Sequence, residues 1–457
     1  MADTVTAFGA DIDTTVGRLT TGYNERGLVI RSTSLNPAGS AVINEAKSAY
    51  NAFNQLVAEW QEHGGAVNTA TSPKVQYSYE DGSANTIRPT GIINPDGSSI
   101  TTGYSTAMAS ALSRPDQIKE GSSVLATLKY LGLGTLVELK YQSAANAMLT
   151  MENGSTGDAG DIYSGLDRFG RLIETIWKTG STDLVHTKYG RNRVGGVVWQ
   201  LNVKAHASSV ATQDNFYWYD GLQQVTRHDR GDLTPGSGPP YTGIDPSTRQ
   251  QMEVFTFDET GNWPGYFSQS PSLTQSRTHN PSNQITSISG PTGAVQPAYD
   301  PAGNMTRMPR PGDWSAAAEL TWDAWNRLVK LRTPSSPSSS SSGSSSSASS
   351  SSDSSSSASG SSSSGSPASL EITYQYDALT RRTRKTNGAG TIDYYYDRQW
   401  RAVEERAAGG VSAQYVWSPL DRWTMIRRKR SVAGTLDETR YVLNGIFTSF
   451  RDGKMTL

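Results

Sequence analysis

The stretch YQYDALTRRTRKTNGAGTIDYYYDRQWRAVEE (residues 374–405) contains the same dipeptide motif twice. Tyr376-Asp377 returns as Tyr396-Asp397, 20 residues later. Each copy is approached by aromatic residues and followed by arginines and an alternation of apolar and polar residues. This repetition raises the question of what a chain gains from a Tyr-Asp pair at that interval.

The interval persists over much of the chain. Upstream pairs advance by 22, 20 and 23 residues, at Phe257-Asp258, His279-Asn280, Tyr299-Asp300 and Trp322-Asp323. Nearer the N-terminus the register is looser, at Tyr23-Asn24, Tyr50-Asn51, Tyr79-Glu80, Leu166-Asp167, Tyr189-Gly190 and Tyr219-Asp220. A fixed period near 20 residues indicates a repeat architecture.

Each pair opens a turn. In Asp167–Gly170 and Asp300–Gly303 a glycine stands three residues after the aspartate, and Asn326 takes that place in another unit. Asp favours the first position of a turn, while Gly and Asn accept a positive φ. The pattern therefore predicts a hairpin turn. Gln223 and Thr380 replace the glycine in two units, where we expect the same turn at a higher conformational cost.

A second turn falls about seven residues before the next pair. Gly293 precedes Asp300, and Gly390 precedes Asp397, by that distance. Two turns in each period leave two strands of about seven residues, a common length in globular proteins. The sequence therefore predicts an all-β fold of stacked antiparallel β-hairpins.

One segment also fits a helix. Between residues 42 and 60 the apolar positions are spaced by three and four, which is helical spacing. The same segment matches the repeat at residues 50–56 (YNAFNQL). We expect strands there, with a helix as the alternative.

The composition excludes several classes of protein. In 457 residues, 41 Lys and Arg oppose 42 Asp and Glu, so no general attraction to nucleic acid is expected. The absence of cysteine excludes disulfides and thiolate metal sites. No apolar run is long enough to span a membrane, and the N-terminus shows no signal-peptide pattern. The chain opens inside the repeat pattern, and we interpret it as a piece of a longer protein.

The repeats are interrupted once. Residues 335–366 are almost pure serine, which offers no apolar surface to offset the entropy of ordering. The predicted organisation is a repeat array over 1–334, a disordered Ser-rich insertion over 335–369, a continued array over 370–426 and a divergent tail over 427–457. Because a longer loop costs little, the units that flank the insertion can remain neighbours.

The pattern Tyr-Asp-x-x-Gly-Arg/Asn-Leu resembles the YD repeat of bacterial Rhs proteins, which is shared with teneurins and with the C-component of insecticidal toxin complexes. The resemblance runs from about residue 17 to residue 418. It implies a β-sheet wound into a hollow shell, which in toxin members encloses a C-terminal effector. No Rhs core domain and no effector are recognised in this chain. Asp300-Pro301 echoes the family's cleavage motif, but it occupies an ordinary repeat turn.

No catalytic, cofactor-binding or metal-binding residue is predicted. The histidines (His63, His186, His206, His228 and His279) show no metal-ligand spacing. His279 stands in an aromatic position of the repeat and is expected to pack. The repeated aspartates are expected to cap turns. The basic runs 381–385 and 427–430 are expected to form a solvated face, with nucleic-acid contact as the alternative.

The expected function is that of a non-enzymatic segment of an Rhs-like β-shell without cofactor. By resemblance it would be secreted or displayed at a cell surface, and its partners would be the rest of a longer protein or an enclosed effector, in toxin encapsulation or intercellular competition. The alternative is a surface adhesin that binds carbohydrate through exposed aromatic residues, because 11 Trp and 21 Tyr offer many rings.

Overall fold

The computed structural model describes residues 1–5, 7, 9, 11–142, 147–150, 165–207, 213–310, 312–334, 369–420, 422–443, 446–451 and 454–456. Nearly all regular structure in this part is β-strand. The two helices described, α1 (Ala107–Ala111) and α2 (Val203–Ala207), are short. The predicted all-β class is confirmed. The serine run lies outside the described residues, so its predicted disorder stays a prediction.

Within the described residues, the first sheet contains 21 strands, which pair antiparallel. Its members are β1 (Ala2–Thr4), β3 (Arg18–Tyr23), β4 (Val29–Leu35), β5 (Val42–Tyr50), β6 (Leu56–Glu62), β7 (Lys74–Tyr79), β8 (Pro89–Ile93), β9 (Ser99–Gly103), β10 (Gln117–Glu120), β11 (Ser123–Leu131), β12 (Thr135–Tyr141), β13 (Met148–Thr150), β14 (Glu174–Thr179), β15 (Thr182–Arg191), β16 (Val197–Asn202), β17 (Asp214–Tyr219), β18 (Val225–Gly231), β21 (Gln251–Thr256), β22 (Gly265–Ser268), β23 (Leu273–His279) and β24 (Ile285–Ser289). A separate hairpin joins β19 (Leu233–Thr234) to β20 (Gly243–Ile244).

The second sheet contains 14 strands in the part of the chain that the structure describes. Its members are β25 (Ala298–Tyr299), β26 (Met305–Arg310), β27 (Asp313–Asp323), β28 (Leu328–Thr333), β29 (Leu370–Tyr376), β30 (Arg382–Asn387), β31 (Gly390–Tyr396), β32 (Ala402–Ala407), β33 (Gly410–Trp417), β34 (Met425–Arg430), β35 (Glu438–Leu443), β36 (Ile446–Arg451), β37 (Lys454–Thr456) and β2 (Ile12–Asp13), which pairs in parallel with β27. Residues 427–457, where the sequence repeat fades, still contribute strands to this sheet.

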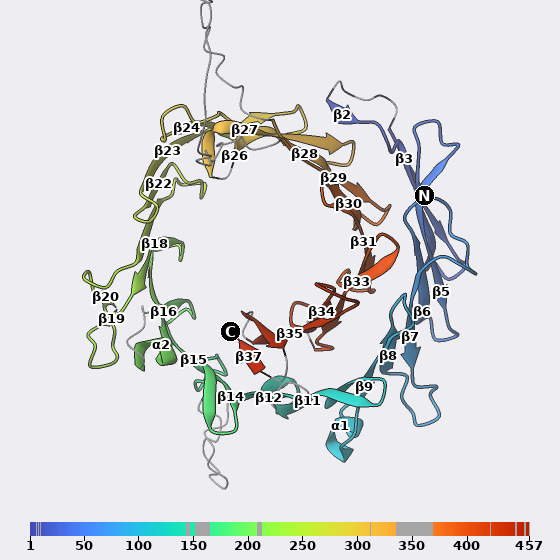
Figure 1. The fold of residues 1–457 in the computed structure, drawn as a ribbon, viewed down its shortest axis with the longest axis horizontal. Helices are drawn as coiled ribbons and strands as arrows, with labels where there is room; N and C mark the ends of the chain where they lie inside the picture. Colours follow the sequence, from blue (N-terminus) through green and yellow to red (C-terminus); the bar gives the residue numbers. More distant parts are fainter. Residues whose placement is uncertain are drawn as a thin grey trace, which may run out of the picture.

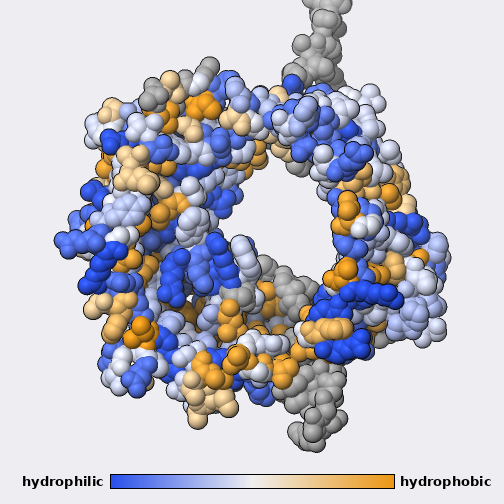
Figure 2. Space-filling model, turned by 180° about the vertical axis from the view of Figure 1, so that it is seen from behind, coloured by the Kyte–Doolittle hydropathy of each residue, from blue (hydrophilic) through white to orange (hydrophobic). Residues whose placement is uncertain are grey.

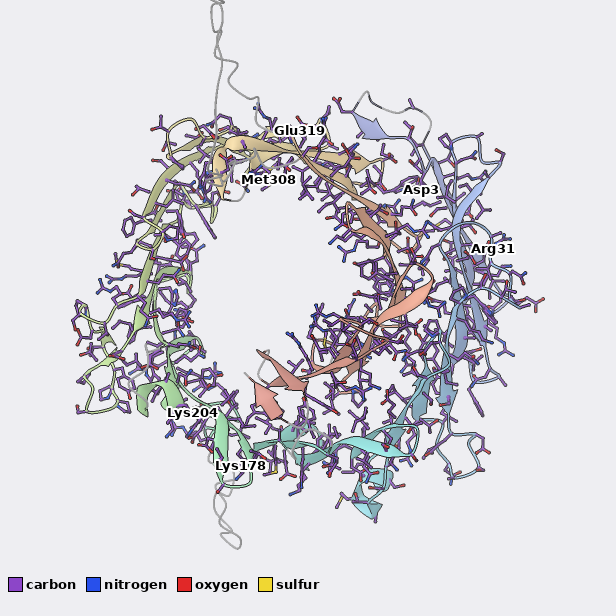
Figure 3. All side chains as sticks on the ribbon, in the orientation of Figure 1. Asp3, Arg31, Lys178, Lys204, Met308 and Glu319 are labelled. Carbon is purple, nitrogen blue, oxygen red and sulfur yellow. The ribbon has the colours of Figure 1, made fainter. Side chains whose placement is uncertain are left out.

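The strands wind around a central opening in more than one turn (Figure 1). The first sheet makes most of the circuit, and the last strands return along the inner side of the strands that began it. A space-filling view shows the opening passing through the molecule (Figure 2). Side chains project from both faces of the wall, toward the opening and away from it (Figure 3). The chain is therefore a spiral whose end forms a second layer against its beginning.

The main apolar core lies between these two layers. The first layer contributes buried residues of β9–β14, and the second contributes buried residues of β33–β35. Its members are Ile100, Ile118, Leu125, Ala126, Leu128, Leu139, Tyr141, Ala147, Leu149, Trp177, Val416, Ile426, Tyr441 and Leu443. A hydrogen bond of 2.9 Å from the Tyr141 hydroxyl to the Val442 carbonyl crosses the same interface. Burial of this apolar surface is the principal force that holds the second layer against the first.

The two sheets meet through side chains. The backbone N–H of Ile288 in β24 donates to the Gln296 side-chain oxygen at 2.8 Å, and the Gln296 amide donates to the Ile288 carbonyl at 3.1 Å. The Tyr299 hydroxyl accepts from the N–H of Ile285 at 3.1 Å. These side chains satisfy edge groups of β24 that a further strand would otherwise pair with.

The segment with helical spacing is a hairpin. Strands β5 and β6 pair antiparallel, with a turn that contains Asn54 between them. The strand expectation is therefore confirmed and the helical alternative is wrong. Strands β5 and β6 pair with each other and with β4 and β7, and these pairings outweigh the helical spacing of a few apolar residues.

The predicted turns also adopt the expected backbone. Gly170 and Gly303 have φ of 72° and 91°. Gln223 and Thr380 have φ of 65° and 67°, so the units without glycine keep the turn with a residue in the left-handed region.

Candidate functional site

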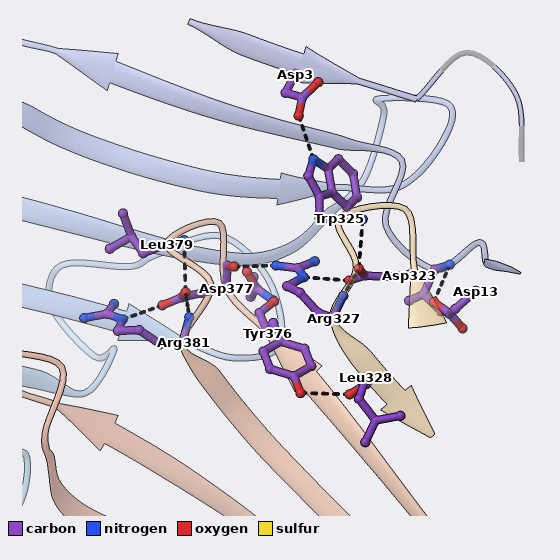
Figure 4. Close-up of polar contacts among 12 residues, drawn as sticks. Asp3, Asp13, Asp323, Trp325, Arg327, Leu328, Tyr376, Asp377, Leu379 and Arg381 are labelled. Carbon is purple, nitrogen blue, oxygen red and sulfur yellow. Dashed lines mark hydrogen bonds and ion pairs between the residues drawn. The ribbon is translucent and has the colours of Figure 1, made fainter. Parts of the chain in front are cut away.

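The repeated aspartate accepts hydrogen bonds from the residues of its own turn, as Figure 4 shows for Asp323 and Asp377. At Asp377, Oδ1 accepts from the backbone N–H of Leu379 at 3.0 Å and of Arg381 at 2.9 Å, while Arg381 Nε donates to Oδ2 at 2.7 Å. The same arrangement occurs at Asp167, Asp323 and Asp397. An aspartate that accepts three such bonds is a cap for a turn.

The aromatic residue of the pair ties its hairpin to the preceding one. The Tyr376 hydroxyl donates to the Leu328 carbonyl at 2.8 Å, and Trp322 Nε1 donates to the Met305 carbonyl at 2.7 Å. In both cases the acceptor is five residues after the aspartate of the preceding turn. The same bond is made by Tyr50, Tyr79, Tyr219, Tyr396 and Trp417. Tyr and Trp are interchangeable at this position because each combines a large ring with a hydrogen-bond donor. The recurrence of Tyr-Asp pairs in the sequence marked these aromatic residues as important. It did not show which backbone carbonyl accepts their hydrogen bond.

Asp300, which resembles the aspartate of the cleavage motif, also caps its own turn. Its Oδ1 accepts from the Asn304 N–H at 2.8 Å and its Oδ2 from the Asn304 amide at 2.9 Å. The Asn304 amide also donates to Asn326 in the next turn, at 2.8 Å. These contacts account for Asp300 as a turn residue; whether the chain cleaves itself stays a prediction.

The basic runs do not form a simple solvated face, so that expectation is wrong in part. Arg381 and Arg427 are buried in the interface between the layers, whereas Arg382 is exposed. Arg427 and Lys429 both contact the Glu120 carboxylate, at 2.6 and 2.9 Å. Although burial opposes it, hydrogen bonds and charge from these two cations lower the pKa of Glu120 to about 2. The first and second layers thus meet through ion pairs that no local pattern revealed.

A buried ion pair crosses the interface near the next turn. Arg381 Nη1 donates to Glu59 Oε1 at 2.5 Å, while its Nε holds Asp377. Burial raises the pKa of Glu59, and the charge of Arg381 opposes that rise. Beside this pair, Gln61 exchanges two hydrogen bonds with the Tyr396 backbone, at 2.7 and 3.0 Å. Gln61 therefore joins the layers by replacing a strand partner.

The four histidines whose side chains the structure describes belong to different elements: His63 follows β6, and His186, His228 and His279 lie in β15, β18 and β23. His63 stacks on Tyr395 with ring centroids 4.7 Å apart. His186 lies between Glu174 and Asp183, at 2.6 and 3.2 Å. No group of three or more His, Cys, Asp and Glu side chains that could hold a metal ion occurs in the described part of the chain. His279 is half-buried in its aromatic position, and the side chain of His206 lies outside the described residues.

One wall of the opening carries a polar and aromatic stripe on β17, β18, β21 and β22. The β19–β20 hairpin lies on the outer side of the ring and covers Phe216 (Figure 1). Because side chains alternate along a strand, Tyr217 and its cross-strand partner His228 point the other way, toward the opening. There Tyr217 stacks on His228 at 5.0 Å, and His228 lies 3.2 Å from Glu253. The Tyr266 hydroxyl donates to Glu253 at 2.8 Å. At this stripe, the inner face of the wall presents hydrogen-bonding side chains rather than an apolar core.

A cavity of about 420 Å³ opens between the layers at another point. The first layer contributes residues of β7–β9, and the second contributes the turn at 397–401 and the end of β33. Its lining residues are Tyr77, Tyr79, Arg88, Pro89, Gly91, Ile92, Ile100, Thr102, Tyr104, Ser113, Pro115, Ile118, Asp397, Arg398, Gln399, Arg401, Trp417 and Pro419. Sequence reasoning missed this site because its two halves are some 300 residues apart.

The exposed aromatic residues belong to several segments of the chain. Trp423 is 80% exposed, Trp400 48% and Trp263 40%, and they belong to three different segments. Other rings are internal: Tyr141 and Trp177 are buried and stack at 5.2 Å. Carbohydrate binding through scattered surface rings stays a prediction, and the cavity is the place where rings from both layers gather.

Comparison with known proteins gives a distant likeness. No family model and no curated protein matches the sequence. Among solved structures, a crystal structure of TcdB2-TccC3-Cdc42 matches with a TM-score of 0.42 at 10% identity, over 88% of this chain and 23% of that one. TcdB2-TccC3 without its hypervariable C-terminal region gives 0.41 at 10% identity, over 89% and 23%. A Tc holotoxin pore from Photorhabdus luminescens, with a mutation in TccC3, gives 0.38 at 12% identity, over 97% and 23%. The chain spans about a quarter of the length of these proteins. Among the described residues, no helix is long and apolar enough to cross a membrane.

Proposed function

We propose that this chain is a wall segment of a hollow β-shell of the Rhs/YD-repeat kind, in a secreted or surface protein that encloses a polypeptide effector. The observation that carries the proposal is the wall of two sheets, joined through side chains, that passes around an opening through the molecule (Figures 1 and 2). A structure that needed only stability would fill its centre with apolar side chains. Here the core lies within the wall instead.

The wall suits an enclosure that performs no chemistry of its own. The repeated carboxylates cap turns or hold arginines, as Asp377 and Asp323 do. The stripe around His228 and Glu253 presents hydrogen-bonding groups to the opening. A polar inner surface can contact an enclosed polypeptide through hydrogen bonds without requiring it to adopt one fixed packing arrangement. We propose that the segment is non-enzymatic on these grounds.

The proposal is tested by placing a polypeptide at either end of the chain. Strand β37 lies inside the ring, whereas β3 lies in its outer wall (Figure 1). We expect electron-microscopy class averages of the purified chain to show a ring with a stain-filled centre. A fusion of a small globular protein after Leu457 should fill or cover that centre, and the same protein fused before Met1 should appear outside the ring.

The two fusions control for each other, because they carry the same added mass. A solid or extended particle for the unfused chain would contradict the shell. Additional density outside the ring in both fusions would contradict enclosure and leave only a ring-shaped scaffold.

A further inference from the structure

We propose that the cavity between β7–β9 and the turn at 397–401 is a binding site for an acidic saccharide, a sugar that carries a carboxylate such as a uronic acid. Its volume of about 420 Å³ falls in the ~300–1,000 Å³ range of small-molecule sites. The inference concerns the wall itself and does not depend on whether the shell encloses a cargo.

Aromatic rings from both layers form much of the cavity wall. Tyr79 and Tyr104 come from the first layer and Trp417 comes from the second. A guanidinium lies over one face of each ring, at 3.9 Å for Tyr104, 5.9 Å for Tyr79 and 5.7 Å for Trp417. The other face of each ring is flat and apolar, which is the kind of surface against which the C–H face of a sugar ring packs. The rings are fixed, because each donates to a backbone carbonyl: Tyr79 to Leu56, Tyr104 to Pro89 and Trp417 to Ala402. A fixed site loses little conformational entropy when it binds.

The charges of the cavity leave one cation without a carboxylate. Arg88 is paired with Glu80 at 2.8 Å, and Arg401 with Asp397 at 2.8 Å. Arg398 Nη1 donates instead to the Tyr79 hydroxyl at 3.0 Å, and no carboxylate of the described residues forms an ion pair with its guanidinium. The cavity therefore carries a net positive charge at its mouth, where Arg398 is exposed. A guanidinium is the side chain best suited to bind a carboxylate through two hydrogen bonds.

Neutral polar groups complete the site. Tyr77 lines the cavity, and its buried hydroxyl makes no hydrogen bond within the described residues, while the Gln399 side chain lies exposed on the lining. A hydroxyl and a primary amide can both donate to and accept from sugar hydroxyls. Ring faces, neutral hydrogen-bonding groups and one unpaired cation together match the apolar face, the hydroxyls and the carboxylate of an acidic sugar.

The test measures binding of trigalacturonic acid to the full chain by isothermal titration calorimetry. The uncharged probe is its methyl ester, which keeps the shape and removes the charge. We expect the acid to bind at least about tenfold more tightly than the ester, because a hydrogen bond to a charged group is worth more than a neutral one. Arg398→Gln should abolish that preference.

Two control variants make the result specific to the cavity. Arg193 occupies the same position in its own turn, directly after Asn192; it is exposed and does not line the cavity. Arg193→Gln should leave binding unchanged. Tyr104→Leu should weaken binding, whereas Tyr219→Leu, which removes the same kind of hydroxyl bond to Val197, should not. Equal binding of acid and ester, no binding of either, or equal losses in the variants and their controls would overturn the proposal.

Discussion

The Tyr376 hydroxyl donates a 2.8 Å hydrogen bond to the Leu328 carbonyl across 48 residues of chain. The equivalent bond from Tyr396 to Arg382 spans 14 residues, and the one from Tyr50 to Val29 spans 21. All three hydrogen bonds join a tyrosine hydroxyl to the equivalent carbonyl of the preceding hairpin. This holds although the serine run lies between Leu328 and Tyr376 in the sequence. Strands β28 and β29 pair directly, from Lys330 with Thr373 to Thr333 with Leu370. The insertion therefore leaves the register of the repeat unchanged.

Deletion of residues 335–366 should change the free energy of unfolding by no more than about 1 kcal/mol. The paired ends at Thr333 and Leu370 already fix the register, and loop closure depends only weakly on length. Urea denaturation followed by tryptophan fluorescence measures the change. A loss of several kcal/mol would mean that the serine run packs against the wall.

Tyr376→Phe should lower the free energy of unfolding by about 1 kcal/mol, because it removes the donor to the Leu328 carbonyl and keeps the ring. Tyr23→Phe is the matched control. Tyr23 holds the corresponding position in the first unit, is 47% exposed, and its hydroxyl makes no hydrogen bond within the described residues. Equal costs for the two changes in the same denaturation assay would show that the bond between hairpins is not what stabilises the stack.

Thr380→Gly should raise the free energy of unfolding by about 1 kcal/mol. Thr380 has a φ of 67°, a region that is unfavourable for a residue with a Cβ and free for glycine. Ala378→Gly in the same turn, where φ is not positive, should instead destabilise because it adds freedom to the unfolded chain. Thermal unfolding of both variants gives the comparison, and a fall in stability for Thr380→Gly would contradict the argument.

Arg381→Met should cost about 3–5 kcal/mol, because it leaves Glu59 buried without its cation. The neighbouring Arg382→Met is the control: Arg382 is exposed and stacks on Tyr394 at 4.9 Å, so its loss should cost about 1 kcal/mol or less. Denaturant titration separates the two. A small cost at Arg381 would mean that water reaches Glu59 between the layers.

Asp300→Asn should leave the chain intact and cost about 1 kcal/mol or less, since the asparagine oxygen can still accept from the Asn304 N–H. Intact-mass spectrometry after prolonged incubation checks for a new N-terminus near Pro301. A fragment that forms in the unmutated chain and is missing in Asp300→Asn would overturn the turn-capping role in favour of self-cleavage.

The sequence by itself determined the repeating unit. Asp377 and Asp397 mark turns because an aspartate can accept from the backbone N–H groups that follow it, and this chemistry is complete within five residues. The left-handed backbone at Gln223 and Thr380 followed from the same pattern. The neighbourhood of β28 and β29 across the serine run followed from the continuity of the repeat. All of these are local or nearest-neighbour properties.

Only the tertiary structure decided which parts of the spiral meet. Glu59 and Arg381 are 322 residues apart, and Glu120 and Arg427 are 307 apart, yet each pair bridges the two layers. The basic runs were expected in solvent for lack of this information. The small twist between neighbouring strands adds up over the whole circuit. This sum decides which strands at the end of the spiral contact which strands at its beginning. No single motif encodes that sum, so the interface, its ion pairs and its cavity appear only once the last strands lie against the first ones.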